Sequence, residues 1–144
     1  MLRTILGILA GIVAGFAAVL AAQALVNLIY PLPAGLDVLD REQVSAAFSA
    51  FPPQHFALIL LTYLIGGFVG AYVARLIARR DWALWVPAAL IALTAAINVF
   101  TYPHPLWAQI GGIVAPLIGA WLAARLPATR RVEGAPAERA DAEI

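Results

Sequence analysis

This 144-residue chain contains no cysteine and no lysine. The lack of cysteine excludes disulfides, thiol nucleophiles and thiolate metal sites. The basic residues are nine arginines, and with eight acidic residues the formal net charge is only +1. The positions of these charges are more informative than their sum, because no charged residue occurs between residues 4 and 36 or between residues 82 and 124.

The long uncharged stretches indicate a membrane protein. Charged residues make up 12% of the chain and apolar residues 63%, whereas soluble domains are about 25% charged and about 45–50% apolar. A soluble chain of this length could not enclose so much apolar surface in one core. Since a spanning helix needs about 20 apolar residues, we predict an all-α membrane protein with four transmembrane helices, at residues 5–29, 56–78, 82–100 and 106–126.

The arginines predict the orientation of these helices. Eight of the nine precede the first predicted helix, join the second to the third, or follow the fourth, and only Arg41 lies on the other side. Positively charged segments stay in the cytoplasm, so both termini are expected there. Arg75, near the end of the second helix, is expected to reach the lipid headgroups with its guanidinium.

A cleaved signal peptide is the alternative interpretation of the first apolar stretch. The sequence AQA at residues 22–24 has the form of a cleavage site, and Arg3 supplies the basic start. The apolar run continues to Tyr30, however, which suits a spanning helix better than the short core of a signal. We therefore expect the first helix to be retained; a mature start at Leu25 would contradict four spans.

A short sequence recurs at the ends of the first and third predicted helices. Residues 27–33 read NLIYPLP and residues 98–105 read NVFTYPHP. A shift of 49 residues also aligns His55 with His104, and GAYVA with GAWLA. We interpret the chain as two helical hairpins that form a parallel internal repeat, and the competing interpretation is convergence of helix-end chemistry.

The first hairpin carries an insert that predicts a short amphipathic helix at residues 41–51. Asp40 is placed to cap it, Gln43 completes a capping box, and Pro52 and Pro53 follow its end. This helix is expected on the outer membrane surface or across the end of the bundle. It is interpreted as a static cap, with a substrate gate as the alternative.

Small residues recur every four positions along the spans, in the pattern of a glycine zipper. Such spacing lets helix backbones approach closely, either within the bundle or between two copies of the chain. The residues expected to pack helices are Gly7, Gly11, Gly15, Gly66, Gly70, Gly111 and Gly119.

Uncharged polar side chains also lie within the predicted spans. Asn27 and Asn98 are expected to hydrogen-bond to other helices, where water is scarce. No Asp or Glu lies inside a span, which argues against a proton-coupled exporter. The polar set that could line a path comprises Gln23, Asn27, Tyr63, Thr94, Asn98 and Gln109.

Two histidines and two carboxylates on the outer side form a candidate metal site. His55 and His104 occupy matching positions of the repeat, and imidazoles with the carboxylates of Asp37 and Asp40 suit zinc or copper. No H-x-x-x-H or H-E-x-x-H spacing supports this site. The alternative is that the histidines only mark the entries of helices. The sequence shows no recognisable set of catalytic residues, and no cofactor is expected.

The polar segment at residues 127–144 mixes charges with many Pro and Ala residues. It is expected to be a disordered cytoplasmic tail. The arginines flank the membrane, so nucleic acid is not an expected partner. The expected partners are the lipid bilayer and either a second copy of the chain or a larger membrane complex.

The outer-loop motifs YPLPAGLD at residues 30–37 and PHPLW at residues 103–107 resemble those of small bacterial membrane proteins of unassigned function. The resemblance covers most of residues 1–126. It implies a four-helix protein of the bacterial inner membrane, and it assigns no functional residue.

Three functions remain open from the sequence. The first is a non-enzymatic protein that acts by helix association. The second is a small dimeric transporter or channel with a path lined by Gln and Asn, which a water-filled cavity reaching those amides would favour. The third is a metal-handling protein or membrane enzyme that uses the outer histidines.

Overall fold

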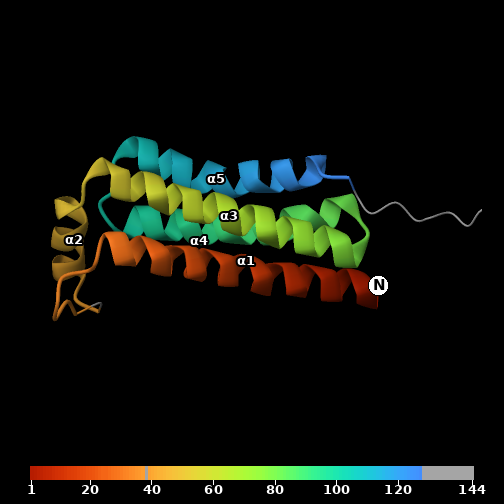
Figure 1. Cartoon of the computed structure of the whole chain (residues 1–144), viewed down its shortest axis with the longest axis horizontal. Coiled ribbons are helices and arrows are strands. Elements are labelled where there is room, and N and C mark those ends of the chain that lie inside the picture. The colour runs from red at the N-terminus through yellow and green to blue at the C-terminus, as the bar shows by residue number, and fades with distance from the viewer. Residues whose placement is uncertain (38, 128–144) are drawn as a thin grey trace, which may run out of the picture.

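The structure, a computed structural model, describes residues 1–37 and 39–127. Within these residues it is all-helical and has no strand (Figure 1). The predicted tail at residues 127–144 lies outside the described residues, except for its first residue. The helices are α1 (Leu2–Ile29), α2 (Arg41–Ala50), α3 (Pro53–Ala78), a 3-10 turn at Asp81–Leu84 that leads into α4 (Trp85–Thr101), and α5 (Leu106–Arg125).

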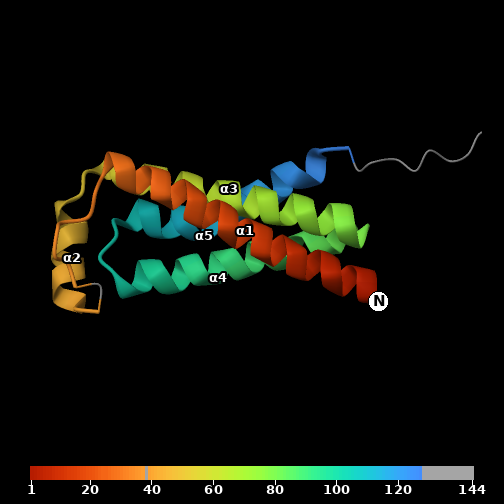
Figure 2. The same ribbon diagram turned by 60° about the horizontal axis from the view of Figure 1, so that its bottom comes forward.

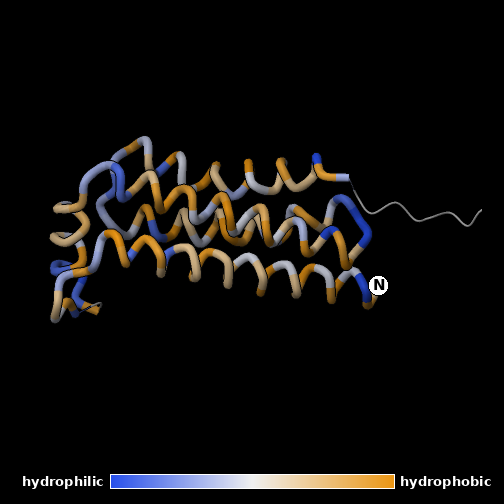
Figure 3. The backbone as a smooth tube through the Cα atoms, viewed as in Figure 1, coloured by the Kyte–Doolittle hydropathy of each residue, from blue (hydrophilic) through white to orange (hydrophobic). Residues whose placement is uncertain are grey.

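Four of these helices are long and apolar enough to cross a membrane, as the sequence predicted. Figure 3 shows apolar residues along all four and hydrophilic residues gathered at the two ends of the bundle. The second span begins at Pro53 rather than at residue 56. Proline is tolerated in the first turn of a helix, where its missing N–H has no partner to lose.

Helix α3 is the centre of the bundle, in contact with α1, α4 and α5. Helices α1 and α5 both pack on α3 and α4, and within the described part of the chain they do not contact each other. The buried core is narrow and consists largely of alanine, with a few larger side chains such as Ile91 and Leu84. Large apolar side chains therefore cover the outside of the bundle, where lipid would solvate them.

Glycines bring the backbones of α1 and α3 together. A Cβ atom added to Gly7 would lie 2.5 Å from the backbone nitrogen of Ala78, and one added to Gly11 would lie 2.6 Å from the carbonyl oxygen of Gly70. Gly15, one turn further along α1, is buried on the same face. Any side chain at these positions would push the helices apart, so the close packing depends on glycine.

The packing of α5 on α3 also uses glycine. A Cβ atom added to Gly119 would collide with the carbonyl oxygen of Leu64, and one added to Gly67 would collide with the backbone of Pro116. Gly111, by contrast, faces a leucine side chain, which can move. Small residues thus line both faces of the central helix.

Helix α2 lies across one end of the bundle (Figures 1 and 2). The Asp40 carboxylate caps it, accepting hydrogen bonds from the backbone N–H groups of Glu42 at 2.9 Å and Gln43 at 3.3 Å. Arg41 donates to the carbonyl oxygen of Thr101 at 3.1 Å and so ties α2 to the end of α4. The amphipathic surface role expected for this segment stays a prediction.

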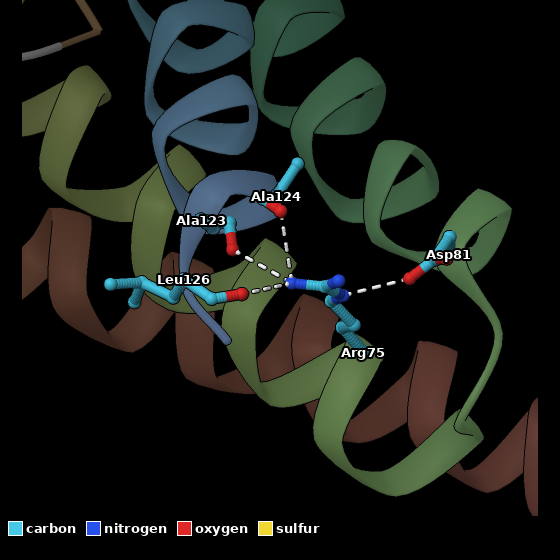
Figure 4. Close-up of polar contacts among 5 residues, drawn as sticks. All are labelled: Arg75, Asp81, Ala123, Ala124 and Leu126. Carbon is cyan, nitrogen blue, oxygen red and sulfur yellow. Dashed lines mark hydrogen bonds and ion pairs between the residues drawn. The ribbon is translucent and has the colours of Figure 1, made fainter. Parts of the chain in front are cut away.

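Arg75 binds the end of α5 rather than extending freely to the membrane surface (Figure 4). Its Nη1 donates to the carbonyl oxygens of Ala123, Ala124 and Leu126 at 2.8–3.2 Å, and its Nε donates to Asp81 at 2.8 Å. The last carbonyls of a helix have no partner within the helix and carry its negative dipole end, so a guanidinium is well placed there. The side chain is 14% exposed.

Candidate functional site

A partly open cavity of about 170 Å³ lies at the end of the bundle that α2 crosses. Figure 2 shows α1 and α4 diverging toward this end. Side chains from α1, α2, α3 and α4, and from the two segments that follow α1 and α4, line the cavity. Its lining consists of Gln23, Asn27, Leu32, Phe48, Phe51, His55, Ile59, Tyr63, Asn98 and His104.

The cavity extends from the α2 end into the length of the bundle. His55, Ile59 and Tyr63 are spaced by four residues on one face of α3, and all three line it. With a rise of 1.5 Å per residue, the distance along the helix from His55 to Tyr63 is about 12 Å. Gln23 lies one turn deeper than Asn27 on α1. The cavity therefore reaches well into the apolar span.

Four of the six polar residues predicted within the spans line this cavity: Gln23, Asn27, Tyr63 and Asn98. The other two do not. Thr94 lies on the exposed side of α4 and donates to the carbonyl oxygen of Leu90 at 3.0 Å. Gln109 donates to the backbone carbonyl of His104 at 2.9 Å.

The expected hydrogen bonds from Asn27 and Asn98 to other helices are not formed. Over residues 1–37 and 39–127, neither amide is hydrogen-bonded to another residue, and both line the cavity instead. The polar groups are thus free for water or for a ligand.

Aromatic rings join α2 to the rest of the bundle and form one wall of the cavity. The ring of Phe51 stacks on His55 with centroids 4.0 Å apart, and Tyr30 meets the edge of His55 at 5.4 Å. Phe48 stacks on Tyr102 at 5.3 Å. Since each such pair contributes about 0.5–1.5 kcal/mol, the rings fix α2 over the cavity.

The two histidines differ in their hydrogen bonds. His104 places Nδ1 at 2.9 Å from the carbonyl oxygen of Tyr102. Because a carbonyl only accepts, this Nδ1 carries the proton. His55 is only 3% exposed, yet its Nδ1 has no hydrogen-bond partner among the described residues. A buried polar atom without a hydrogen-bond partner destabilises the folded protein. His55 is therefore the side chain of this site whose position stability does not explain.

The carboxylates expected beside the histidines instead accept hydrogen bonds from α2 and from the segment just before it. Asp37 accepts a hydrogen bond from the backbone N–H of Leu39 at 2.9 Å. The N–H of Gln43 and its side-chain amide hold the pKa of Asp40 below its ordinary value. Among the residues that the structure describes, no three His, Asp or Glu side chains lie together as a metal site would require. The predicted metal site at His55, His104, Asp37 and Asp40 therefore finds no support.

The apolar part of the lining was missed from the sequence. Phe48 and Phe51 fall within the short amphipathic helix predicted at residues 41–51, which the sequence does not connect to a cavity, and no motif marks Ile59. The spacing of His55, Ile59 and Tyr63 was the available signal, because residues four apart share one helix face.

The lining contains amides, a phenol, two imidazoles and aromatic rings, and no Asp, Glu, Lys or Arg. A charged molecule would meet no counter-ion here and would lose its hydration. The cavity is suited to uncharged molecules held by hydrogen bonds and ring contacts.

Comparison of the chain with protein-family models, with curated proteins and with solved structures gives no match. The resemblance to small bacterial membrane proteins therefore stays a prediction.

Proposed function

We propose that this protein is a non-enzymatic integral membrane protein that admits a small uncharged molecule into the cavity beneath α2, as a transporter or a binding protein. The observation that carries the proposal is the position of Asn27 and Asn98, whose unpartnered amides line an open cavity within the bundle. Amides inside a membrane span are costly unless water or a ligand satisfies them, because lipid tails offer no hydrogen bonds. A protein that only needed stability would have apolar residues there.

The predicted internal repeat is consistent with the same proposal. The shift that matches Asn27 with Asn98, and the shift that matches His55 with His104, each pair two residues that line the one cavity. Two parallel hairpins would bring matching residues to a shared site in this way.

The proposed setting is the bacterial inner membrane, with both termini in the cytoplasm and the cavity on the outer side. Arg3, Arg75, Arg79 and Arg125 lie near the ends of helices opposite α2, and of the arginines in the described residues only Arg41 lies with α2 (Figure 1). This asymmetry is the basis of the positive-inside rule.

Self-association is the weaker alternative. It was suggested by the small residues of the spans, but Gly7, Gly11 and Gly119 are occupied by contacts within the chain. A homodimer or a larger membrane complex would have to use other surfaces.

Cysteine labelling tests the proposal, because the chain has no cysteine of its own. Asn98→Cys places a thiol in the cavity. Ile97→Cys places one at the same depth on the outside of α4, where the native side chain is 62% exposed and would face lipid. In lipid nanodiscs, a small uncharged methanethiosulfonate should label Asn98→Cys at least about tenfold faster, because it reacts with thiolate, which forms only in contact with water. Equal rates would overturn the proposal.

A further inference from the structure

The size of the cavity limits its ligand to about one ring. Its volume is about 170 Å³. An apolar cavity of about 150 Å³ in another protein holds one benzene molecule, whereas sites for drug-sized molecules measure about 300 Å³ or more. A single ring, or one ring of a longer molecule, fits this space.

The walls favour an aromatic ring. Phe48 and Phe51 line the cavity from α2, and the imidazole of His55 is stacked on Phe51. Aromatic side chains bind other rings through offset or edge contacts. The same walls offer little to a strongly hydrated sugar or polyol.

The polar groups require a ligand that can both donate and accept. The amide NH₂ of Asn98 and the hydroxyl of Tyr63 are donors, and His55 carries a buried Nδ1 with no partner in the described chain. A neutral imidazole has one acceptor nitrogen. A ring hydroxyl can donate to such a nitrogen and accept from the amide or the phenol at the same time.

From these observations, and resting on the proposed function, we infer that the cavity binds an uncharged hydroxylated aromatic ring of the phenol or hydroquinone class. The ring lies between Phe48 and Phe51 on one side and the polar residues on the other, and its hydroxyl hydrogen-bonds to the imidazole of His55. The ring is either a free molecule or the head of a lipid-like amphiphile whose tail leaves between α1 and α4, where Asn27 is exposed.

The test uses the full chain in nanodiscs and measures binding of four probes by isothermal titration calorimetry. The probes are hydroquinone, the same ring with an alkyl tail, toluene, and cyclohexanol. Hydroquinone should bind at least about tenfold more tightly than toluene or cyclohexanol, since each lacks one of the two features that the site recognises. A tailed ring that binds more tightly still identifies an amphiphile, and equal binding identifies a free ring.

Two substitutions locate the hydrogen bonds. His55→Phe keeps a ring beside Phe51 and removes the nitrogen, and Tyr63→Phe removes only a hydroxyl. Each should weaken hydroquinone binding by about three- to tenfold and leave toluene binding unchanged. Thr94→Val, on the exposed side of α4, is the matched control and should change neither.

Failure of this inference differs from failure of the proposed function. If Asn98→Cys is labelled rapidly but hydroquinone does not bind, or binds no better than toluene, the cavity exists and the ligand class is wrong. Unchanged hydroquinone binding in both His55→Phe and Tyr63→Phe would also overturn the inference.

Discussion

The ring of His55 stacks on the ring of Phe51 with their centroids 4.0 Å apart and their planes 16° from parallel. Phe51 is the C-terminal cap of α2, and His55 lies in the first turn of α3. This pair therefore holds one end of α2 over the cavity. Arg41, at the other end of α2, donates a hydrogen bond to the carbonyl oxygen of Thr101.

Phe51→Ala should release this end of α2. The substitution removes a stacked pair worth about 0.5–1.5 kcal/mol, so hydrogen exchange of the α2 amides should accelerate several-fold while α3 and α5 stay protected. Leu39→Ala, at a fully exposed side chain beside α2, is the control. Unchanged exchange in Phe51→Ala would mean that other contacts hold α2.

Gly11→Val should separate α1 from α3. A Cβ atom at this position would lie 2.6 Å from the Gly70 carbonyl oxygen, and that backbone cannot yield without moving the helix. Overpacking of this kind costs about 1–3 kcal/mol, measured as a lower free energy of unfolding in mixed micelles. Ala17→Val adds apolar volume on the exposed side of the same helix and should be nearly neutral. Equal stability of the two variants would contradict the packing described here.

Arg75→Gln should destabilise α5 more than Asp81→Asn does. The guanidinium bonds three carbonyl oxygens at the end of α5, and its acidic partner is 83% exposed. An exposed ion pair contributes about 0–1 kcal/mol, whereas hydrogen bonds from a charged group contribute about 1.5–3 kcal/mol. Thermal unfolding of both variants distinguishes the two roles. A larger loss in Asp81→Asn would show that the ion pair is the main interaction.

The four spans could be predicted because they depend on local composition. A stretch such as residues 82–100 has no charge, and its length alone matches a bilayer. The start of α3 lies three residues before the predicted one. The sequence predicts that Pro52 and Pro53 follow the end of the preceding helix, whereas Pro53 occupies the first turn of the next one.

The cavity could not be predicted, because it depends on how helices that are far apart in the sequence meet. Its lining comes from α1, α2, α3 and α4, and no local stretch of sequence shows that these side chains come together. The amides of Asn27 and Asn98 look the same in the sequence whether they bond to a helix or face a cavity.

Cysteine labelling in intact cells should place α2 outside the cytoplasm. The positive-inside rule predicts this orientation, and Leu39 is fully exposed beside α2. A membrane-impermeant maleimide should label Leu39→Cys in intact spheroplasts and should label Trp82→Cys, near the opposite end of the bundle, only after lysis. Labelling of Trp82→Cys without lysis would reverse the proposed topology.

Acid should weaken the capping of α2, because the ionised carboxylate of Asp40 accepts stronger hydrogen bonds than the protonated carboxyl does. The N–H and the side-chain amide of Gln43 lower the pKa of this carboxyl in the folded protein. A carboxyl with a lowered pKa contributes stability above its ordinary pKa, and the contribution is lost as the pH falls through the lowered value. Hydrogen exchange of the α2 amides, corrected for the intrinsic pH dependence of exchange, should therefore show lost protection only at acid pH.

Asp40→Asn separates this effect from titration of other groups, because asparagine is an equally good N-cap and does not ionise in this range. That variant should keep α2 protected at neutral pH and lose the acid-dependent step. An acid step of the same size in Asp40→Asn would assign the pH dependence to another group.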